Sequence, residues 1–413
     1  MSFIIASVQL IVLLLIVGCE RRSTSGLRKS FLIFQLILFT ALQIIPSWLY
    51  FDDIRVQTIN ALFLLGVYAG YLAFSNTRRE SLGENPPFNS NDVSVAKSIL
   101  LCALLILIFF VGIDFVLPPL FGENPELERM AFMSAYTPYL RITNYMLPLV
   151  ATYGLLALAL NRDVSCLWKG TMGACLYALI IVMGSYGGNK TSIFAHLLVL
   201  FYFIAERRVP INFRLAKYVG FTAICSVVVM VVIYVQEDIG AFVANRLYES
   251  NLAGLRTVMN YTDQQGHLYG MATLTPILLF LTKTTGYNYE SSWSTPGQLM
   301  AMYDSGTNES SGFEYLNGMQ GDAYLDFGFL GVIIYAFIVT GLMLSARRAM
   351  LRVLNPTTYV LYFFLYICAA QCLFIGKIGS FIVSSLVSYL VIGSILIYMG
   401  QSKSLPMLKI TNP

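Results

Sequence analysis

The chain has 413 residues, of which 57% are hydrophobic and only 12% are charged. Soluble domains average about a quarter charged residues, so this composition excludes an ordinary soluble protein and predicts an integral membrane protein. The net charge of +4 comes from basic segments between apolar runs, and it gives no support to binding of nucleic acid.

Apolar runs recur along the whole chain. A helix needs roughly 20 apolar residues to cross a bilayer, and an open strand would leave backbone groups unpaired in lipid. We therefore predict an all-α polytopic membrane protein in which residues 1–413 form a single integral membrane domain. The first run has no basic region before it and no small-residue cleavage site, so it predicts a span and not a signal peptide. About eleven spans are expected, at residues 2–18, 31–50, 57–75, 98–118, 139–160, 169–185, 191–205, 217–235, 323–345, 357–375 and 378–399.

The basic residues predict the orientation of these spans. Most of the 26 Lys and Arg residues follow spans one, three, five, seven and nine or lie in the C-terminal tail. Because cytoplasmic loops have an excess of Lys and Arg, the N-terminus is predicted to lie outside and the C-terminus inside. The cations on the outer side are Arg55, Arg129, Arg141, Lys190, Arg246, Arg256, Lys283 and Lys377.

The largest connection, residues 236–321, lies between spans eight and nine on the outer side. A connection of this length usually has a function or a structure of its own. Its segment "MATLTPILLFL" at 271–281 is apolar but too short to span, and it predicts an interfacial or re-entrant helix. A second amphipathic segment, "ANRLYESNLAGLRTVMNY", places Arg246 and Arg256 on neighbouring faces of an interfacial helix.

Four outer cations are candidates for binding an anionic ligand. Guanidinium groups bind phosphate bidentately, so Arg246 and Arg256 suit a phosphate or pyrophosphate; a salt bridge or bulk anionic lipid is the alternative. Arg141 begins span five without an adjacent acid, and Lys190 lies in the glycine-rich turn "GSYGGNKTS". A snorkelling side chain is the alternative for these two.

Three acids lie at the outer boundary of span nine, in "GFEYLNGMQGDAYLDFGFLG": Glu314, Asp322 and Asp326. Carboxylates are costly in hydrocarbon, but the N-terminus of a helix favours negative charge. Asp322 could therefore cap span nine, and a role in a functional site is the alternative; it shares a helix face with Asp326. Gly328 and Gly331 are expected to allow close packing against a neighbouring helix.

His267 is one of two histidines and the one predicted to lie outside. It is a candidate base or hydrogen-bond partner, with a purely structural role as the alternative. The seven cysteines show no spacing typical of a disulfide framework or a metal site, and the chain has no nucleotide-binding fingerprint.

The run "FEYLNGMQGDAYLDFGFLGV" resembles the Wzy-type polymerases of O-antigen and exopolysaccharide repeat units. That family often shows Gly-acid-Ala-Tyr-Leu-Asn-Phe-Gly-x-x-Gly where a large periplasmic loop enters a span. Here the acid is Asp322, where Glu is common, and Asp326 stands where Asn is common. The resemblance is specific over residues 240–335, including "RLYESNLAGLRTVMNY" and "LYGMATLTPILLFL", and is architectural elsewhere.

This resemblance implies a GT-C-like glycosyltransferase at the periplasmic face of the bacterial inner membrane. A hydroxyl of one undecaprenyl-pyrophosphate-linked oligosaccharide attacks the anomeric carbon of the growing chain, and undecaprenyl pyrophosphate leaves. No cofactor and no metal are implied; the partners implied are the lipid bilayer, a chain-length regulator and a flippase. Four of the outer cations, Arg246, Arg256, Arg141 and Lys190, would stabilise the leaving group. Glu314, Asp322 and His267 are alternatives for the acceptor of the hydroxyl proton. The expected catalytic residues are Arg246, Arg256, Glu314, Asp322 and His267, and the expected substrate-binding residues are Arg141, Lys190, Tyr248 and Tyr324.

Two other functions stay open at this point. An O-antigen ligase performs the same chemistry with lipid A core as the acceptor, and the "GDAYLDFG" run favours the polymerase over it. A flippase or other transporter typically has repeated halves and short loops, whereas this chain has no internal repeat and a long outer connection.

Overall fold

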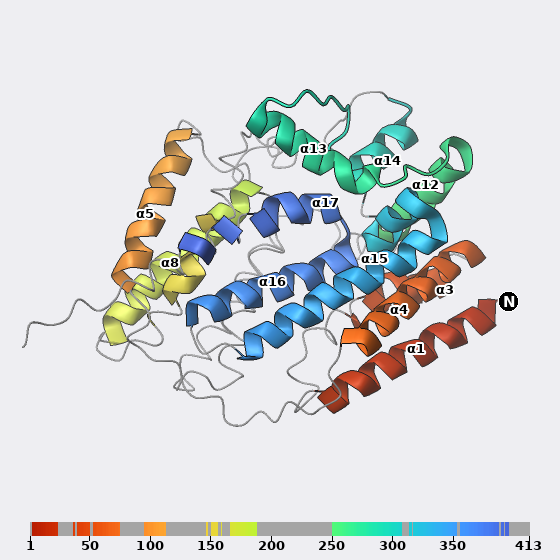
Figure 1. The fold of residues 1–413 in the computed structure, drawn as a ribbon, viewed down its shortest axis with the longest axis horizontal. Coiled ribbons are helices and arrows are strands. Elements are labelled where there is room, and N and C mark those ends of the chain that lie inside the picture. Colours follow the sequence, from red (N-terminus) through yellow and green to blue (C-terminus); the bar gives the residue numbers. More distant parts are fainter. Residues whose placement is uncertain are drawn as a thin grey trace, which may run out of the picture.

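The computed structural model describes residues 2–23, 36–37, 39–49, 53–74, 95–112, 146–147, 150–155, 158, 166–187, 250–307, 314–315, 317–352, 356–387, 390–391 and 393–395. Regular structure in these ranges is helical throughout, without a strand, so the predicted helical class is confirmed (Figure 1). The elements are α1 (Ser2–Ser23), the π-helix η2 (Thr40–Ile44), α3 (Ile45–Leu49), α4 (Ile54–Phe74), α5 (Val95–Gly112), α8 (Cys166–Gly187), α12 (Ser250–Gln265), α13 (Met271–Thr285), α14 (Pro296–Ser305), α15 (Gly318–Arg352), α16 (Pro356–Ile375), α17 (Ile378–Ser380) and the π-helix η6 (Phe381–Leu386).

Two helices in the described part of the chain are long and apolar enough to cross a membrane. They are α4 and the segment Gly318–Met350 of α15, which correspond to the third and ninth predicted spans. The seventh and eighth predicted spans, 191–205 and 217–235, lie outside the described residues. Shorter apolar helical stretches occur at Ile4–Glu20, Ile99–Val111, Gly170–Ile180 and Leu361–Leu373.

Helices α1, α4 and α15 run in the same direction and are tied together where they end (Figure 1). α4 packs against both α1 and α15, and α15 also packs against α16. The buried carboxylate of Glu20 lies 2.6 Å from Arg347 Nη1 and accepts a hydrogen bond from Tyr71. In the predicted topology the odd-numbered spans also share one direction; which end faces the cytoplasm stays a prediction.

The α4–α15 interface is built on two glycines. A Cβ added at Gly66 would lie 2.6 Å from the carbonyl oxygen of Ile333, and one at Gly70 would lie 2.9 Å from that of Phe337. The glycines stand four residues apart, in the small-xxx-small spacing that lets membrane helices approach closely. The backbone of α15 therefore lies directly on the surface of α4.

Helix α15 is broken near its start. Phe327 has φ −139° and ψ 21°, and Gly328 has φ 63° and ψ −149°, a conformation essentially restricted to glycine. The predicted close packing against a neighbouring segment is found at Gly328 but not at Gly331. A Cβ at Gly331 would overlap the carbonyl oxygen of Ala323 across the break in the same helix, and one at Gly328 would lie 3.1 Å from His267 Nε2.

The connection between α12 and α13 pairs the backbone groups that this break exposes. The carbonyl oxygens of Leu325 and Asp326 accept hydrogen bonds of 2.9 Å from the backbone N–H groups of Leu268 and Tyr269. Irregular backbone at membrane depth is tolerated where it is buried in protein. The break in α15 is therefore stabilised by these hydrogen bonds, which join residues 268–269 to α15.

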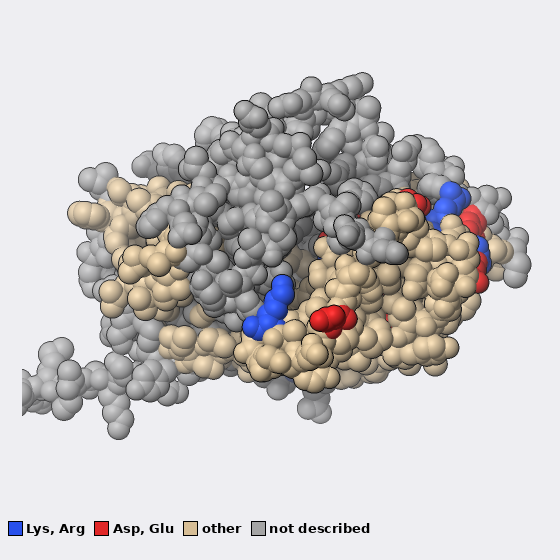
Figure 2. Space-filling view, turned by 90° about the horizontal axis from the view of Figure 1, so that it is seen from above, with Lys and Arg blue, Asp and Glu red and all other residues tan. Residues whose placement is uncertain are grey.

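Helices α12, α13 and α14 lie together at one end of α15 (Figure 1). Buried Leu255 and Val258 of α12 face α15, and α13 contacts both α15 and α17. The helix predicted at 271–281 is confirmed as α13, while its position relative to a bilayer stays a prediction. In Figure 2 the described surface is mostly uncharged, and its acidic and basic side chains gather mainly toward one edge.

Candidate functional site

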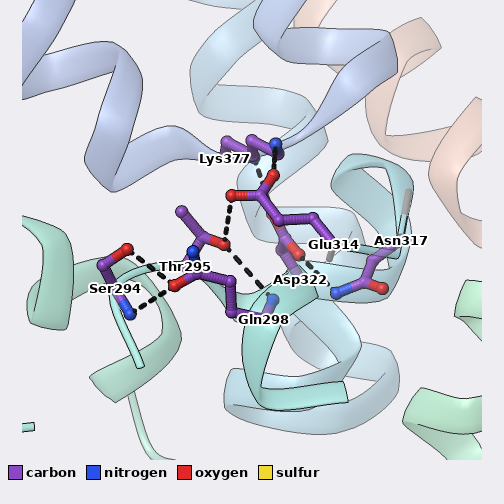
Figure 3. A network of polar contacts seen from close by, with 7 residues as sticks. All are labelled: Ser294, Thr295, Gln298, Glu314, Asn317, Asp322 and Lys377. Atoms are coloured by element: carbon purple, nitrogen blue, oxygen red, sulfur yellow. Dashed lines mark hydrogen bonds and ion pairs between the residues drawn. The ribbon is translucent and has the colours of Figure 1, made fainter. Parts of the chain in front are cut away.

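The two aspartates of α15 hold two other segments of the chain. Asp322 is 4% exposed; its Oδ2 accepts a hydrogen bond of 2.6 Å from the backbone N–H of Lys377, and its Oδ1 accepts one of 3.2 Å from Asn317 Nδ2 (Figure 3). The prediction that Asp322 caps span nine is therefore wrong. It lies in the second turn of α15 and fixes the turn that precedes α17.

Asp326 caps α13 from a different helix. Its Oδ1 accepts from the backbone N–H of Ala272 at 2.8 Å, and its Oδ2 accepts from that of Thr273 at 3.2 Å. The hydroxyls of Thr273 and Tyr335 each donate to Oδ2 at 2.9 Å. The residue at the N-cap position of α13 is Gly270, which has no side chain to fill this role. A carboxylate supplied by α15 replaces it.

Glu314 is the accessible carboxylate of this region. Its Oε1 accepts a hydrogen bond of 3.0 Å from Thr295 Oγ1, and its Oε2 is ion-paired with Lys377 Nζ (Figure 3). The side chains of Glu314 and Lys377 are 28% and 31% exposed. We call Glu314, Asp322 and Lys377 the acid–lysine cluster. It combines one buried and one accessible carboxylate around a single cation.

Helix α14 positions Glu314. Thr295 precedes the first turn of α14 and accepts a hydrogen bond from the backbone N–H of Gln298, as an N-cap residue does. Tyr315 follows Glu314 and bonds to α14 twice: its N–H donates to the carbonyl of Gly297 at 3.1 Å, and its hydroxyl donates to Asp304 at 2.6 Å. The hydrogen bond to Asp304, with burial, raises the pKa of Tyr315 to about 12. The phenol therefore stays protonated at neutral pH and keeps this bond.

Two amide side chains beside the cluster have unpaired polar atoms. Gln320 is fully buried, and neither its Oε1 nor its Nε2 has a hydrogen-bond partner. Asn317 is 3% exposed, and its Oδ1 is likewise unpaired. Buried polar groups are normally satisfied, so these unpaired atoms are unusual for a folded protein.

Tyr324 lies on another face of α15, where it contacts His267 of the connection between α12 and α13. Their rings meet edge to face with centroids 5.5 Å apart, and Tyr324 is buried. Two residues along a helix differ by about 200° in direction, so Tyr324 and Asp322 point to opposite sides. The structure thus brings Glu314 and Asp322 together, with Lys377 added, and separates them from His267 and Tyr324.

The remaining predicted residues are only partly within the described structure. Arg256 is exposed on α12. The described residues contain no group of three or more His, Cys, Asp and Glu side chains that could hold a metal ion. Four predicted residues lie outside the described ranges: Arg141, Lys190, Arg246 and Tyr248.

Lys377 is the residue of the cluster that sequence reasoning left out of the predicted site. The sequence did contain a sign of its importance: Lys377 is the one Lys or Arg between residues 353 and 402, and it separates two apolar runs. An ionisable residue within apolar segments is a default candidate for function. What the sequence could not supply was its partner, Glu314, which lies 63 residues earlier.

Comparisons with protein-family models, curated proteins and solved structures find no match to this chain. The similarity to repeat-unit polymerases therefore rests on the sequence run that contains Asp322 and Asp326.

Proposed function

We propose that this protein is a membrane-embedded polysaccharide polymerase of about eleven spans with a GT-C-like architecture. It joins undecaprenyl-pyrophosphate-linked oligosaccharide repeat units into O-antigen or a related surface polysaccharide at the periplasmic face of the inner membrane. The apolar composition, the helical fold with two long apolar helices, and the resemblance around Asp322 support this proposal.

The observation that most favours a glycosyl-transfer site is the accessible carboxylate of Glu314 beside Lys377. A transfer between two lipid-linked glycans needs a group that accepts the hydrogen bond of the attacking hydroxyl. It also needs a cation where charge develops on the leaving group. Glu314 and Lys377 supply one of each in direct contact, and both side chains are partly exposed.

The proposed reaction is a single displacement. The hydroxyl oxygen of the incoming repeat unit forms a bond to the anomeric carbon of the growing chain, and the bond from that carbon to the pyrophosphate oxygen breaks. Glu314 takes the hydroxyl proton, and undecaprenyl pyrophosphate leaves with both electrons of the broken bond. Inversion at the anomeric carbon is the expected outcome.

Within this proposal the other predicted residues have distinct roles. Asp322 has both oxygens bonded inside the protein, so we assign it to positioning the Lys377 turn and not to contact with substrate. Arg256, exposed on α12, and Arg246 are proposed to bind the pyrophosphate. His267 lies against the opposite face of α15 and becomes a weaker candidate for the base.

The test uses the purified protein in liposomes with an undecaprenyl-pyrophosphate-linked repeat unit, and products are resolved as a ladder on a gel. Wild type is expected to make long chains, and Glu314→Gln is expected to leave single units. Glu290→Gln is the matched control, because Glu290 is exposed in the same loop. A normal ladder from Glu314→Gln would remove Glu314 from the chemistry.

A deletion strain separates the polymerase from the alternatives. Loss of a polymerase leaves single repeat units attached to lipid A core, whereas loss of an O-antigen ligase leaves none attached. Loss of a flippase would leave the lipid-linked units on the cytoplasmic side. Arg246→Ala and Arg256→Ala in the same strain are expected to abolish long chains while the protein still inserts, and normal ladders from both would contradict their leaving-group role.

A further inference from the structure

Lys377 has an unusual place in the chain. It stands between helices α16 and α17, in a region from 353 to 402 that has no other basic residue. Charged groups in apolar segments are rare because they are costly, and they commonly mark a ligand or ion site. Its position therefore calls for a reason beyond solubility.

The backbone of Lys377 is also unusual. It has φ 62° and ψ 45°, and the preceding Gly376 has φ 87°. The left-handed region favours Gly, Asn and Asp and is uncommon for other residues. Because Asp322 needs only the backbone N–H of residue 377, a Gly or Asn there would serve the turn better than Lys. The reason for a lysine at position 377 therefore lies in its side chain and not in its backbone.

Stability alone is a weak reason for that side chain. The ammonium of Lys377 pairs with Glu314, and about a third of each side chain is exposed to solvent. Ion pairs of this exposure usually contribute little to the free energy of folding. The same exposure leaves the ammonium open to an incoming anion, which makes Glu314 a displaceable partner.

The turn that carries Lys377 lies against the start of α15. The amide of Gln320 folds back over Gly318, whose carbonyl lies next to Gly376. The side chains of Gln320 and Asn317 are buried there. At this turn the partly exposed ammonium of Lys377 is therefore the donor that an incoming anion can reach.

We infer that Lys377 is a further anion-binding residue of the site, and that its ammonium contacts the pyrophosphate of a polyprenyl-linked substrate. Glu314 is its counter-ion when no substrate is bound. Arrival of the pyrophosphate transfers the ammonium from the carboxylate to phosphate oxygen and frees Glu314 to accept the hydroxyl of the second substrate. This inference rests on the proposed polymerase function and names a further residue that recognises the leaving group.

The experiment measures binding and polymerisation separately on the full chain in nanodiscs. The probe is undecaprenyl pyrophosphate, with undecaprenyl monophosphate and inorganic pyrophosphate as parallel arms. Lys377→Asn removes the charge and keeps a residue that tolerates the left-handed backbone. Lys283→Asn, on the exposed last turn of α13, is the matched control. Thermal melting of each variant shows whether it is folded.

Lys377→Asn is expected to weaken undecaprenyl pyrophosphate binding by about tenfold to a hundredfold, as loss of a charged hydrogen-bond donor does. Glu314→Gln is expected to bind as tightly as wild type or more tightly, since it removes the competitor for the ammonium, while its polymerisation is lost. A merely structural ion pair predicts that both variants lose binding together. If only undecaprenyl pyrophosphate binds tightly, the ligand is the lipid-linked pyrophosphate. If inorganic pyrophosphate binds equally tightly, the site binds the free anion.

The two proposals fail in different ways. Unchanged binding in Lys377→Asn overturns the inference and leaves the polymerase proposal standing. Binding that depends on Lys377 in a wild-type protein that makes no polymer supports the inference and overturns the polymerase. Wild type that binds no pyrophosphate in any arm overturns the inference.

Discussion

Asp326→Ala is expected to release the N-terminus of α13 from α15. The carboxylate accepts from the backbone N–H groups of Ala272 and Thr273 and from the hydroxyls of Thr273 and Tyr335. The two hydroxyls already lie 3.1 Å apart, so they can bond to each other when the carboxylate is gone. The backbone N–H of Thr273 also lies 3.2 Å from the carbonyl oxygen of Gly270, so it keeps an acceptor. The backbone N–H of Ala272 loses its acceptor, which costs about 1–3 kcal/mol. The expected loss is therefore about 1–3 kcal/mol for Asp326→Ala.

Asp326→Asn tests whether α13 needs the hydrogen-bond acceptor or the negative charge of Asp326, because Asn keeps one acceptor oxygen and is uncharged. Asn retains one carbonyl oxygen, which can still accept from the backbone N–H of Ala272, so the expected loss is smaller, about 0.5–1.5 kcal/mol. Hydrogen exchange in detergent, followed on peptides that cover residues 271–276, measures the local opening of α13. Asp304→Ala is the control, since Asp304 bonds to Tyr315 and not to α13. The reasoning is refuted if Asp326→Ala exchanges like wild type, or if Ala and Asn are equally damaging.

Three further predictions are tested by thermal unfolding in detergent. Gly328→Ala is expected to cost about 1–3 kcal/mol, because its backbone conformation is essentially restricted to glycine, and an unchanged melting temperature would contradict the break in α15. Gly66→Ala is expected to separate α4 from α15 and lower the melting temperature. Gly18→Ala is the control: a Cβ at Gly18 has no atom within 4 Å, so this change is expected to be neutral or stabilising by up to about 1 kcal/mol. Equal changes in melting temperature for the two variants would argue against the close interface. Arg347→Ala leaves the buried carboxylate of Glu20 with the hydroxyl of Tyr71 but without its cation. The expected cost is about 3–5 kcal/mol, and a smaller cost for the double change Arg347→Ala with Glu20→Gln would support that cause.

Sequence reasoning found the elements better than the contacts between them. The apolar run at 271–281 predicted α13 because a short apolar segment has few other stable states. The acids and glycines of "GDAYLDFGFLG" were singled out from the sequence, but Asp322 holds the turn before α17 and does not cap α15. Both carboxylates bond to donors more than 50 residues away in sequence, and local rules for helix caps consider only the nearest turn.

The glycines show the same limit. A glycine in an apolar helix predicts either close packing or a break, and neighbouring residues do not decide between them. Packing is found at Gly66 and Gly70, where α15 supplies backbone atoms, and the break is found at Gly328, where residues 268–269 supply the missing donors. Whether a glycine allows close packing or a break depends on the segment that lies against it, and only the folded structure shows that segment.

The pair of aspartates on α15 also constrains the order in which the chain is completed during synthesis. Asp326 caps a helix that has left the ribosome earlier, and Asp322 bonds to residue 377, which emerges later. Helix α13 must therefore wait for α15 before its first turn is capped, and the Lys377 turn cannot close until α16 has followed. Since chains fold as they are made, from the N-terminus onward, the acid–lysine cluster is one of the last parts to form. A nascent chain that stops before residue 377 would contain Glu314 and Asp322 without the residue whose side chain and backbone bond to them.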